Sequence, residues 1–254
     1  MEILNFDTLF IILICLTLAS ITYYKGLLNI DGAVTAFFMA LFIGFQGSIT
    51  FILLLVIFLL SAFLATRYEF GYKKKRGIQQ GLEGERGWKN VVANGAVPTA
   101  ILVLSGSGAV VSIGFLESSL VFPLFVASIA AAASDTLASE MGMVSDKTYL
   151  ITNLRKVEPG TNGGVSLYGE LWALIGAVYT FFVAQIMFYF SNFPLLSLIV
   201  IILGTGISFL SCQFDSIFGA TLERKGVMSK SMVNFTSISI SMIIYGGILW
   251  QIGY

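Results

Sequence analysis

The sequence contains no histidine, and only 11% of its 254 residues are charged. An average soluble domain has roughly 25% charged residues, so this composition excludes a soluble globular enzyme, a disordered chain and a nucleic-acid-binding protein. The absence of histidine removes the usual general base and the commonest zinc ligand. The two cysteines, Cys15 and Cys212, lie far apart in or beside apolar segments, which argues against a disulfide framework or a zinc site.

Apolar residues make up 57% of the chain, and the mean hydropathy is +0.90. Apolar stretches recur at roughly the 17 to 25 residues needed to cross a bilayer core of about 30 Å. The sequence therefore predicts an all-α polytopic membrane protein, a single transmembrane domain over residues 1–254, with no cleavable signal. We predict eight helices, at 6–24, 30–46, 49–66, 91–112, 119–141, 165–190, 194–213 and 233–252. Seven spans remain an alternative, because the second helix is short and the connection between the fourth and fifth is apolar.

The basic residues are confined to four of the connections. All 14 Lys and Arg residues follow the first, third, fifth or seventh predicted helix. They are Lys25, Arg67, Lys73, Lys74, Lys75, Arg76, Arg86, Lys89, Lys147, Arg155, Lys156, Arg224, Lys225 and Lys230. The positive-inside rule then predicts cytosolic loops at about 67–90, 142–164 and 214–232, with both termini outside. We expect an integral multi-pass protein of a prokaryotic cell membrane, with its active site facing the cytosol.

A four-residue pattern occurs three times, as Asp-Gly-Ala-Val at 31–34, Asn-Gly-Ala-Val at 94–97 and Asn-Gly-Gly-Val at 162–165. Each copy lies at the predicted start of an even-numbered helix. Asp and Asn are good N-caps, and small residues allow helices to pack closely. The pattern also fits three helix N-termini that present free N–H groups to a phosphate. Both interpretations are open at this point.

Three carboxylates lie inside or at the ends of apolar helices, where ionisable residues are costly and usually functional. Asp135 and Glu140 lie at the cytosolic end of the fifth helix, and Asp215 closes the seventh. Carboxylates without histidine or cysteine suit a hard cation such as Mg²⁺. We therefore predict Asp135, Glu140 and Asp215 as catalytic residues and magnesium ligands, with a supporting contact to the ligands as the alternative role of Glu140.

The segment 158–166 has three glycines, an Asn and two hydroxyl residues in front of a helix. Glycine allows backbone N–H groups to converge on an anion, and a flexible turn between helices is the alternative interpretation. The last loop, 215–234, is a candidate cover for the same site. The predicted nucleotide-binding residues are Arg86, Lys89, Asn94, Gly160, Thr161, Asn162, Gly163, Gly164, Ser166 and Asn234.

Four segments resemble motifs of the phytyl-phosphate kinase family, over nearly the whole chain. They are Ala93-Asn94-Gly95, Asp135-Thr136-Leu137-Ala138-Ser139-Glu140-x-Gly142, Pro159-Gly160-Thr161-Asn162-Gly163-Gly164-Val165-Ser166 and Asp215-Ser216-x-x-Gly219-Ala220-x-Leu222. The resemblance implies a multi-pass membrane kinase. Such an enzyme would transfer a phosphoryl group from a nucleoside triphosphate, CTP in the plant reaction, to a prenyl monophosphate such as phytyl or geranylgeranyl phosphate.

We therefore expect a magnesium-dependent prenyl-phosphate kinase with CTP as donor. Its expected partners are the prenyl-phosphate lipid and membrane lipid, and no nucleic acid is expected. A CTP-dependent prenol kinase and a prenyl-phosphate cytidylyltransferase are alternatives within the same chemistry. A membrane transporter is the alternative from a different class. Prenyl chain length, nucleotide base and oligomeric state are left open.

Overall fold

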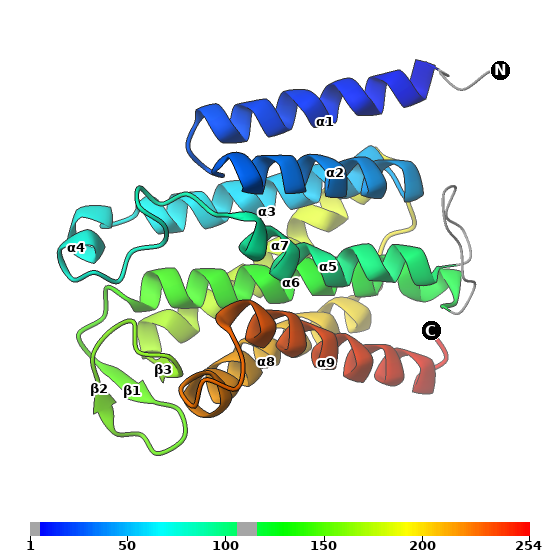
Figure 1. Ribbon diagram of the computed structural model, residues 1–254. Helices are drawn as coiled ribbons and strands as arrows, with labels where there is room; N and C mark the ends of the chain where they lie inside the picture. Colours follow the sequence, from blue (N-terminus) through cyan, green and yellow to red (C-terminus); the bar gives the residue numbers. More distant parts are fainter. Residues whose placement is uncertain (1–5, 106–115) are drawn as a thin grey trace.

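The computed structural model describes residues 6–105 and 116–254. Within these ranges eight long helices form a bundle (Figure 1), as the sequence predicts. Five of them, α3, α6, α7, α8 and α9, are long and apolar enough to cross a membrane by the criteria of length and composition. The long helices are α1 (Phe6–Tyr24), α2 (Ile30–Gln46), α3 (Ile49–Arg67), α5 (Trp88–Leu104), α6 (Ser118–Gly142), α7 (Leu167–Phe190), α8 (Leu198–Phe218) and α9 (Lys230–Gln251).

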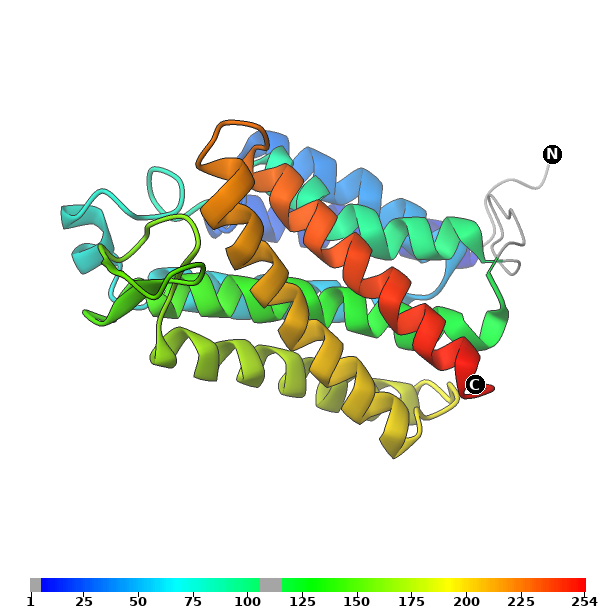
Figure 2. The ribbon, with the colours of Figure 1, turned by 90° about the horizontal axis from the view of Figure 1, so that it is seen from below.

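The connections alternate between the two ends of the bundle. In Figures 1 and 2 the connections α1–α2, α3–α5, α6–α7 and α8–α9 lie at one end, whereas the C-terminus lies at the other. All 14 Lys and Arg residues lie in or beside the first set of connections. We call this end the basic end. The separation of charge expected from the sequence is thus present in the fold, while the assignment of the basic end to the cytosol stays a prediction.

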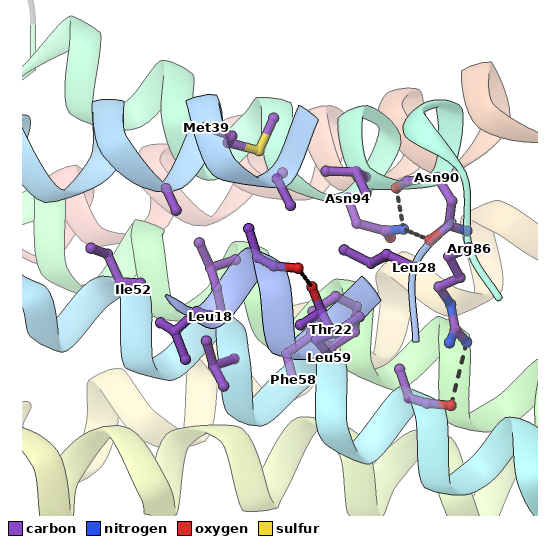
Figure 3. Close-up of a pocket in the computed structure, with 18 of the residues that line it drawn as sticks. Leu18, Thr22, Leu28, Met39, Ile52, Phe58, Leu59, Arg86, Asn90 and Asn94 are labelled. Carbon is purple, nitrogen blue, oxygen red and sulfur yellow. Dashed lines mark hydrogen bonds between the residues drawn. The ribbon is translucent and has the colours of Figure 1, made fainter. Parts of the chain in front are cut away.

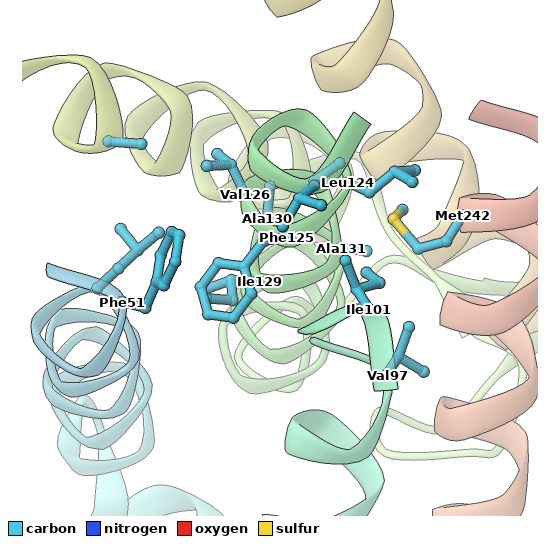
Figure 4. Close-up of a cluster of buried hydrophobic side chains, with 14 of the residues drawn as sticks. Phe51, Val97, Ile101, Leu124, Phe125, Val126, Ile129, Ala130, Ala131 and Met242 are labelled. Carbon is cyan, nitrogen blue, oxygen red and sulfur yellow. The ribbon is translucent and has the colours of Figure 1, made fainter. Parts of the chain in front are cut away.

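Helix α6 lies at the centre of the bundle and contacts α3, α5, α7, α8 and α9. Within its most apolar window 89% of residues are buried, against 33–44% for the other four candidate spans. Figure 4 shows side chains of α3, α5 and α9 packed around its middle, where the Phe51 and Phe125 rings are 4.3 Å apart. An amphipathic surface helix would not bury so much of its surface, so α6 is the central helix against which the others pack.

Small residues bring α6 and α7 into close contact. A Cβ atom at Gly176 would lie 2.8 Å from the carbonyl oxygen of Ala133, and one at Gly169 would lie 2.9 Å from that of Ala138. Glycine at these positions therefore lets the two backbones approach more closely than larger side chains would allow. This contact fixes the start of α7 beside the polar end of α6.

Helix α5 differs from the predicted span 91–112, because it begins at Trp88 and ends at Leu104. The early start comes from tertiary contacts. Asp31 Oδ1 accepts a hydrogen bond from the Trp88 N–H at 3.1 Å, and the N–H of Arg86 donates to the carbonyl of Leu27 at 3.0 Å. The part of the prediction that covers residues 106–112 lies outside the described residues.

The connection between α6 and α7 was expected to be a loop, but it contains a three-stranded antiparallel sheet. Its strands are β1 (Thr148–Leu150), β2 (Lys156–Val157) and β3 (Gly164–Val165), in the order β2-β1-β3. Tyr149 pairs with Lys156 on one side and Val165 on the other. Two further short elements occur at the basic end, the helix α4 (Phe70–Lys75) and the π-helical segment η1 (Gly219–Glu223) that continues α8.

The threefold pattern does not mark three helix N-termini. The N-cap of α2 is Asn29, so Asp31 lies in the first turn. Asn94 lies well inside α5, and Asn162 precedes α7, whose N-cap is Ser166. The N-cap interpretation is therefore wrong for all three copies, because capping contacts chosen by the fold set the helix starts at other residues.

Candidate active site

A polar cavity of about 290 Å³ opens at the basic end between α6, α7, α8, η1 and the segment 160–166. We call it the carboxylate cavity. It is lined by Asp135 and Asp215, and also by six of the predicted nucleotide-binding residues, Gly160, Thr161, Asn162, Gly163, Gly164 and Ser166. The structure therefore brings together two of the three predicted carboxylates and residues 160–166 of the glycine-rich segment, which are up to 80 residues apart in the sequence.

The carboxyl groups of Asp135 and Asp215 are neighbours in this cavity, close enough for a hydrogen bond when one of them is protonated. The side-chain amide of Asn234 donates to Asp135 Oδ2 at 3.3 Å. Among the described residues, Asp215 Oδ2 and Asn234 Oδ1 are buried without a hydrogen-bond partner. Buried oxygens of this kind are costly unless something binds them, so these two unpartnered oxygens indicate a cationic ligand.

The charge around the pair is strongly acidic. Glu170 and Glu223 also line the cavity, and within the described parts of the chain the only basic side chain that lines it is that of Lys230. The amide of Gln213 donates to Glu170 at 2.7 Å. Four acids against one lysine would repel a bare phosphate and would favour a phosphate that arrives with a cation.

The donor set fits Mg²⁺ only in part. No group of three or more acidic, cysteine or histidine side chains in the described ranges is placed to hold a metal ion. Mg²⁺ is usually held by one or two carboxylates together with substrate phosphates and waters. Asp135 and Asp215 therefore suit a magnesium ion that is shared with a nucleotide, and they do not form a site enclosed by protein alone.

Glu140 does not reach the carboxylate cavity, which corrects its predicted role as a metal ligand. Its carboxylate lies 2.9 Å from Lys73 Nζ and 3.6 Å from Arg86 Nη2. The hydroxyl of Thr66 donates to Glu140 Oε1 at 2.9 Å. Glu140 is only 3% exposed and Lys73 is 0% exposed. We call these four side chains the buried ion cluster; it already satisfies the Glu140 carboxylate.

The buried ion cluster attaches the long α3–α5 connection to the bundle. Lys73 also donates to the carbonyl of Ala65 at 2.8 Å, in the last turn of α3, where the helix dipole favours positive charge. Burial lowers the pKa of the Arg86 guanidinium from its ordinary value, and the negative charge of Glu140 opposes this lowering. Arg86 therefore has a structural partner, and the structure does not bring it to the glycine-rich segment as predicted.

The glycine-rich segment is an ordered turn. The N–H of Thr161 donates to Glu158 and that of Gly164 donates to Thr161, at 3.2 and 2.8 Å. Gly163 has φ +75°, and a Cβ there would lie 2.5 Å from the backbone nitrogen of Ala220 in η1. Glycine is thus required at this position by the turn and by close packing, and the N–H groups of Thr161 and Gly164 are already bonded within the turn.

The remaining predicted residues line two other spaces. Lys89 and Asn234 line a second cavity of about 320 Å³, together with Asp31, Trp88, Asn90 and Lys230. Asn94 and Arg86 line a third space, an apolar pocket of about 110 Å³. The residues predicted to bind one triphosphate are therefore divided among three neighbouring spaces.

Sequence reasoning missed Glu170 and did not single out Lys230 from the other basic residues of the last loop. Glu170 lies in the first turn of α7, where an acid ordinarily complements the helix dipole. Lys230 is the first residue of α9. Neither residue carries a sequence signal for the cavity, because their proximity to Asp135 and Asp215 depends on how α7 and α9 pack against α6.

The fold and site define a polytopic membrane protein with a polar, acidic cavity at one end of its helical bundle. The family model described as "Integral membrane protein DUF92" matches residues 13–245. The chain therefore belongs to this family of integral membrane proteins.

Three relatives illustrate the breadth of the similarity. An uncharacterised membrane protein of Methanocaldococcus jannaschii is 30% identical over 253 residues, covering 96% of this chain and 97% of that protein. Protein PGR of Arabidopsis thaliana is 27% identical over 89% of this chain and 82% of its own length. Protein VTE6, chloroplastic, of the same plant is 30% identical over 78% of this chain and 58% of its own length. The family resemblance inferred from the motifs is confirmed by these matches. No solved structure shows significant similarity to the chain.

Proposed function

We propose that this protein is a membrane kinase that transfers a phosphoryl group from a nucleoside triphosphate, with CTP as the expected donor, to a prenyl monophosphate. The observation that carries the proposal is the pair formed by Asp135 and Asp215, with an unpartnered buried oxygen, in a polar cavity at the basic end. Family membership and the motif resemblance support the same reaction class.

In the proposed reaction an oxygen of the prenyl phosphate forms a bond to the γ-phosphorus of the nucleotide. The bond from that phosphorus to the bridging oxygen breaks, and the nucleoside diphosphate leaves with the electron pair. A magnesium ion, when bound with the nucleotide, would supply neutralisation of the phosphate charge. The acceptor oxygen is already ionised, so the chain needs no strong general base and the lack of histidine is no obstacle.

The protein's own part in this reaction is positioning and charge. Asp135 and Asp215 would hold the cation that accompanies the triphosphate, and Asn234 would keep the Asp135 carboxylate in place through its hydrogen bond. Lys230 would contact the phosphate at which charge develops. The glycine-rich turn would form the wall against which the nucleotide lies.

The position of the cavity favours an enzyme over a transporter. Transport sites usually lie near the middle of the membrane between repeated halves, whereas the carboxylate cavity lies beside the connections at the basic end. If this end faces the cytosol, as the distribution of Lys and Arg predicts, a nucleotide reaches the cavity from water and the lipid chain stays in the bilayer.

The direct test is a product assay with purified protein, magnesium, labelled CTP and geranylgeranyl phosphate. We expect prenyl diphosphate from the wild type and little product from Asp215→Asn. Asp146→Asn is the matched control, since Asp146 is exposed and lies 3.7 Å from Arg76 in a surface pair, and it should keep full activity. A CDP-lipid product would indicate a cytidylyltransferase, and a monophosphate made from the prenol would indicate a prenol kinase. Equal activity of Asp215→Asn and Asp146→Asn would contradict the proposed site.

A further inference from the structure

The apolar pocket lies between α1, α2, α3 and α5, and most of its lining is hydrocarbon (Figure 3). It is long and narrow. Ile52 and Ala62 of α3 both line it, and ten residues of helix span about 15 Å. Its volume of about 110 Å³ is smaller than the roughly 150 Å³ cavity that accepts a benzene molecule. A slot of this length and volume suits a linear apolar chain better than a compact ring.

One end of the pocket is polar. Arg86, Asn90 and Asn94 lie at the end opposite Ile52 in Figure 3. Arg86 is 4% exposed and Asn94 is 5% exposed. Arg86 Nη1 and Asn94 Oδ1 are buried with no hydrogen-bond partner in the described ranges. Unpartnered buried groups are costly, so this end of the pocket is suited to the polar part of an amphiphile, and Asn90 at the same end also lines the second cavity.

The three spaces are adjoining. Asn90 lines both the apolar pocket and the second cavity, and Lys230 lines both the second cavity and the carboxylate cavity. The surroundings therefore change in order from the hydrocarbon of the apolar pocket, through the mixed polar lining of the second cavity, to the acids of the carboxylate cavity. A molecule with an apolar chain and a charged head that lies along these spaces has its chain in the apolar part and its head in the polar part.

The charges in the second cavity are the reverse of those in the carboxylate cavity. The second cavity has two lysines, Lys89 and Lys230, and one acid, Asp31, whose carboxylate already accepts the Trp88 N–H. Two cations beside one hydrogen-bonded carboxylate favour an anion that has no accompanying cation. A phosphate monoester has this character, whereas a nucleotide bound with magnesium fits the acidic cavity.

We propose that the acceptor lipid binds with its phosphate in the second cavity and the adjoining part of its chain in the apolar pocket, so that acceptor and nucleotide meet at Lys230. The inference rests on the proposed function for the identity of the lipid. It assigns the chain, the acceptor phosphate and the nucleotide to three different sets of residues.

The chain site is tested by filling the end of the apolar pocket that lies far from Arg86. Ala40→Leu puts a larger side chain into that end, and Ala100→Leu makes the same change on an exposed face of α5 that does not line the pocket. The readout is the dissociation constant for prenyl phosphates without nucleotide. Excluding two methylenes corresponds to roughly a tenfold loss, so Ala40→Leu should weaken geranylgeranyl phosphate about tenfold, dimethylallyl phosphate much less, and Ala100→Leu should change neither.

The phosphate site is tested by comparing geranylgeranyl phosphate with geranylgeraniol. Lys89→Met should weaken binding of the phosphate about tenfold, the loss expected for one charged hydrogen bond, and leave binding of the alcohol unchanged. Lys75→Met is the matched control, because Lys75 is exposed at the same end and lines none of the three spaces. If Ala40→Leu does not fold, Ala36→Leu fills the same pocket from one turn nearer the polar end.

Several outcomes separate this inference from the proposed function. Equal loss for long and short chains in Ala40→Leu, or equal effects of Lys89→Met and Lys75→Met, would overturn the inference even if diphosphate is formed normally. The expected binding pattern without any diphosphate product would support the inference and contradict the kinase. No binding of any prenyl phosphate by the wild type would overturn both.

Discussion

Helix α6 carries two acids at the same end of the bundle, and their surroundings differ completely. Glu140 contacts Lys73, Arg86 and Thr66, and each of its two carboxylate oxygens has a partner. Asp135 faces a second carboxylate, Asp215, and receives one amide hydrogen bond. Five residues correspond to about 140° around a helix, so the two acids face different neighbours. One acid stabilises the fold, and the other is left for a ligand.

The largest effect on the free energy of unfolding is expected when Glu140 loses its charge and no longer differs from Asp135 in being paired. Glu140→Gln leaves Lys73 and Arg86 buried without their counter-charge, and removing one partner of a buried ion pair costs about 3–5 kcal/mol. We expect the free energy of unfolding of the purified protein to fall by about this amount. The measurement is a denaturant titration in detergent. A variant as stable as the wild type would show that the cluster does not hold the α3–α5 connection in place.

The opposite result is expected at Asp135. Asp135→Asn removes one of two neighbouring carboxylates and keeps the side-chain volume, so the free energy of unfolding should stay the same or rise. Phosphoryl transfer should fall by about 100-fold or more, because losing even a residue that supports a metal ligand costs about 10–100-fold. The two measurements are made on the same preparation. A variant that loses stability and keeps its activity would reverse the roles assigned to the two acids.

A smaller loss of stability is expected when the Thr66 hydroxyl is removed from the buried ion cluster. Thr66 Oγ1 lies 2.9 Å from both Glu140 Oε1 and Arg86 Nη2. Thr66→Val keeps the shape and removes this hydroxyl, so unfolding should become easier by about 1–3 kcal/mol, the cost of leaving a buried polar partner unsatisfied. Thr17→Val is the control, since the Thr17 hydroxyl bonds only within its own exposed turn. Equal changes for the two variants would mean that the hydroxyl adds nothing to the cluster.

The smallest effect is expected at the exposed pair of Lys74 and Glu83, although its 2.6 Å distance is shorter than the one between Lys73 and Glu140. The two side chains are 50% and 67% exposed, and surface pairs contribute about 1 kcal/mol or less. Glu83→Gln should therefore change the free energy of unfolding only slightly, and it serves as the matched control for Glu140→Gln. A loss as large as that of Glu140→Gln would show that burial is not what distinguishes the two pairs.

The helical bundle was predictable because membrane spans have a strong local signal. Long apolar runs, with basic residues in alternate connections, indicate seven or eight helices, their approximate bounds and their alternation across the membrane. The predicted and observed bounds of α1 and α2 are identical. The start of α5 was not predictable to the same degree, because the Trp88 N–H is bonded by Asp31 from another helix.

The candidate site was predictable only where a residue type was unexpected for its surroundings. Asp135 and Asp215 are carboxylates in apolar helices, and the segment 158–166 is unusually rich in glycine, so each could be identified from the sequence. Glu140 carries the same signal as Asp135, and nothing in the sequence indicates that Lys73 would neutralise it. Glu170 and Lys230 look like ordinary helix-terminal charges.

The sequence by itself determined that the chain spans a membrane many times, that its basic residues gather at one end, and that acids lie near that end, because these properties depend on local composition. Only the tertiary structure decided which acid is paired and which is left open, and that the predicted phosphate-binding residues line three neighbouring spaces. The physical reason is that a carboxylate's role depends on the charges brought against it by other helices, and α6 presents Asp135 and Glu140 to different neighbours.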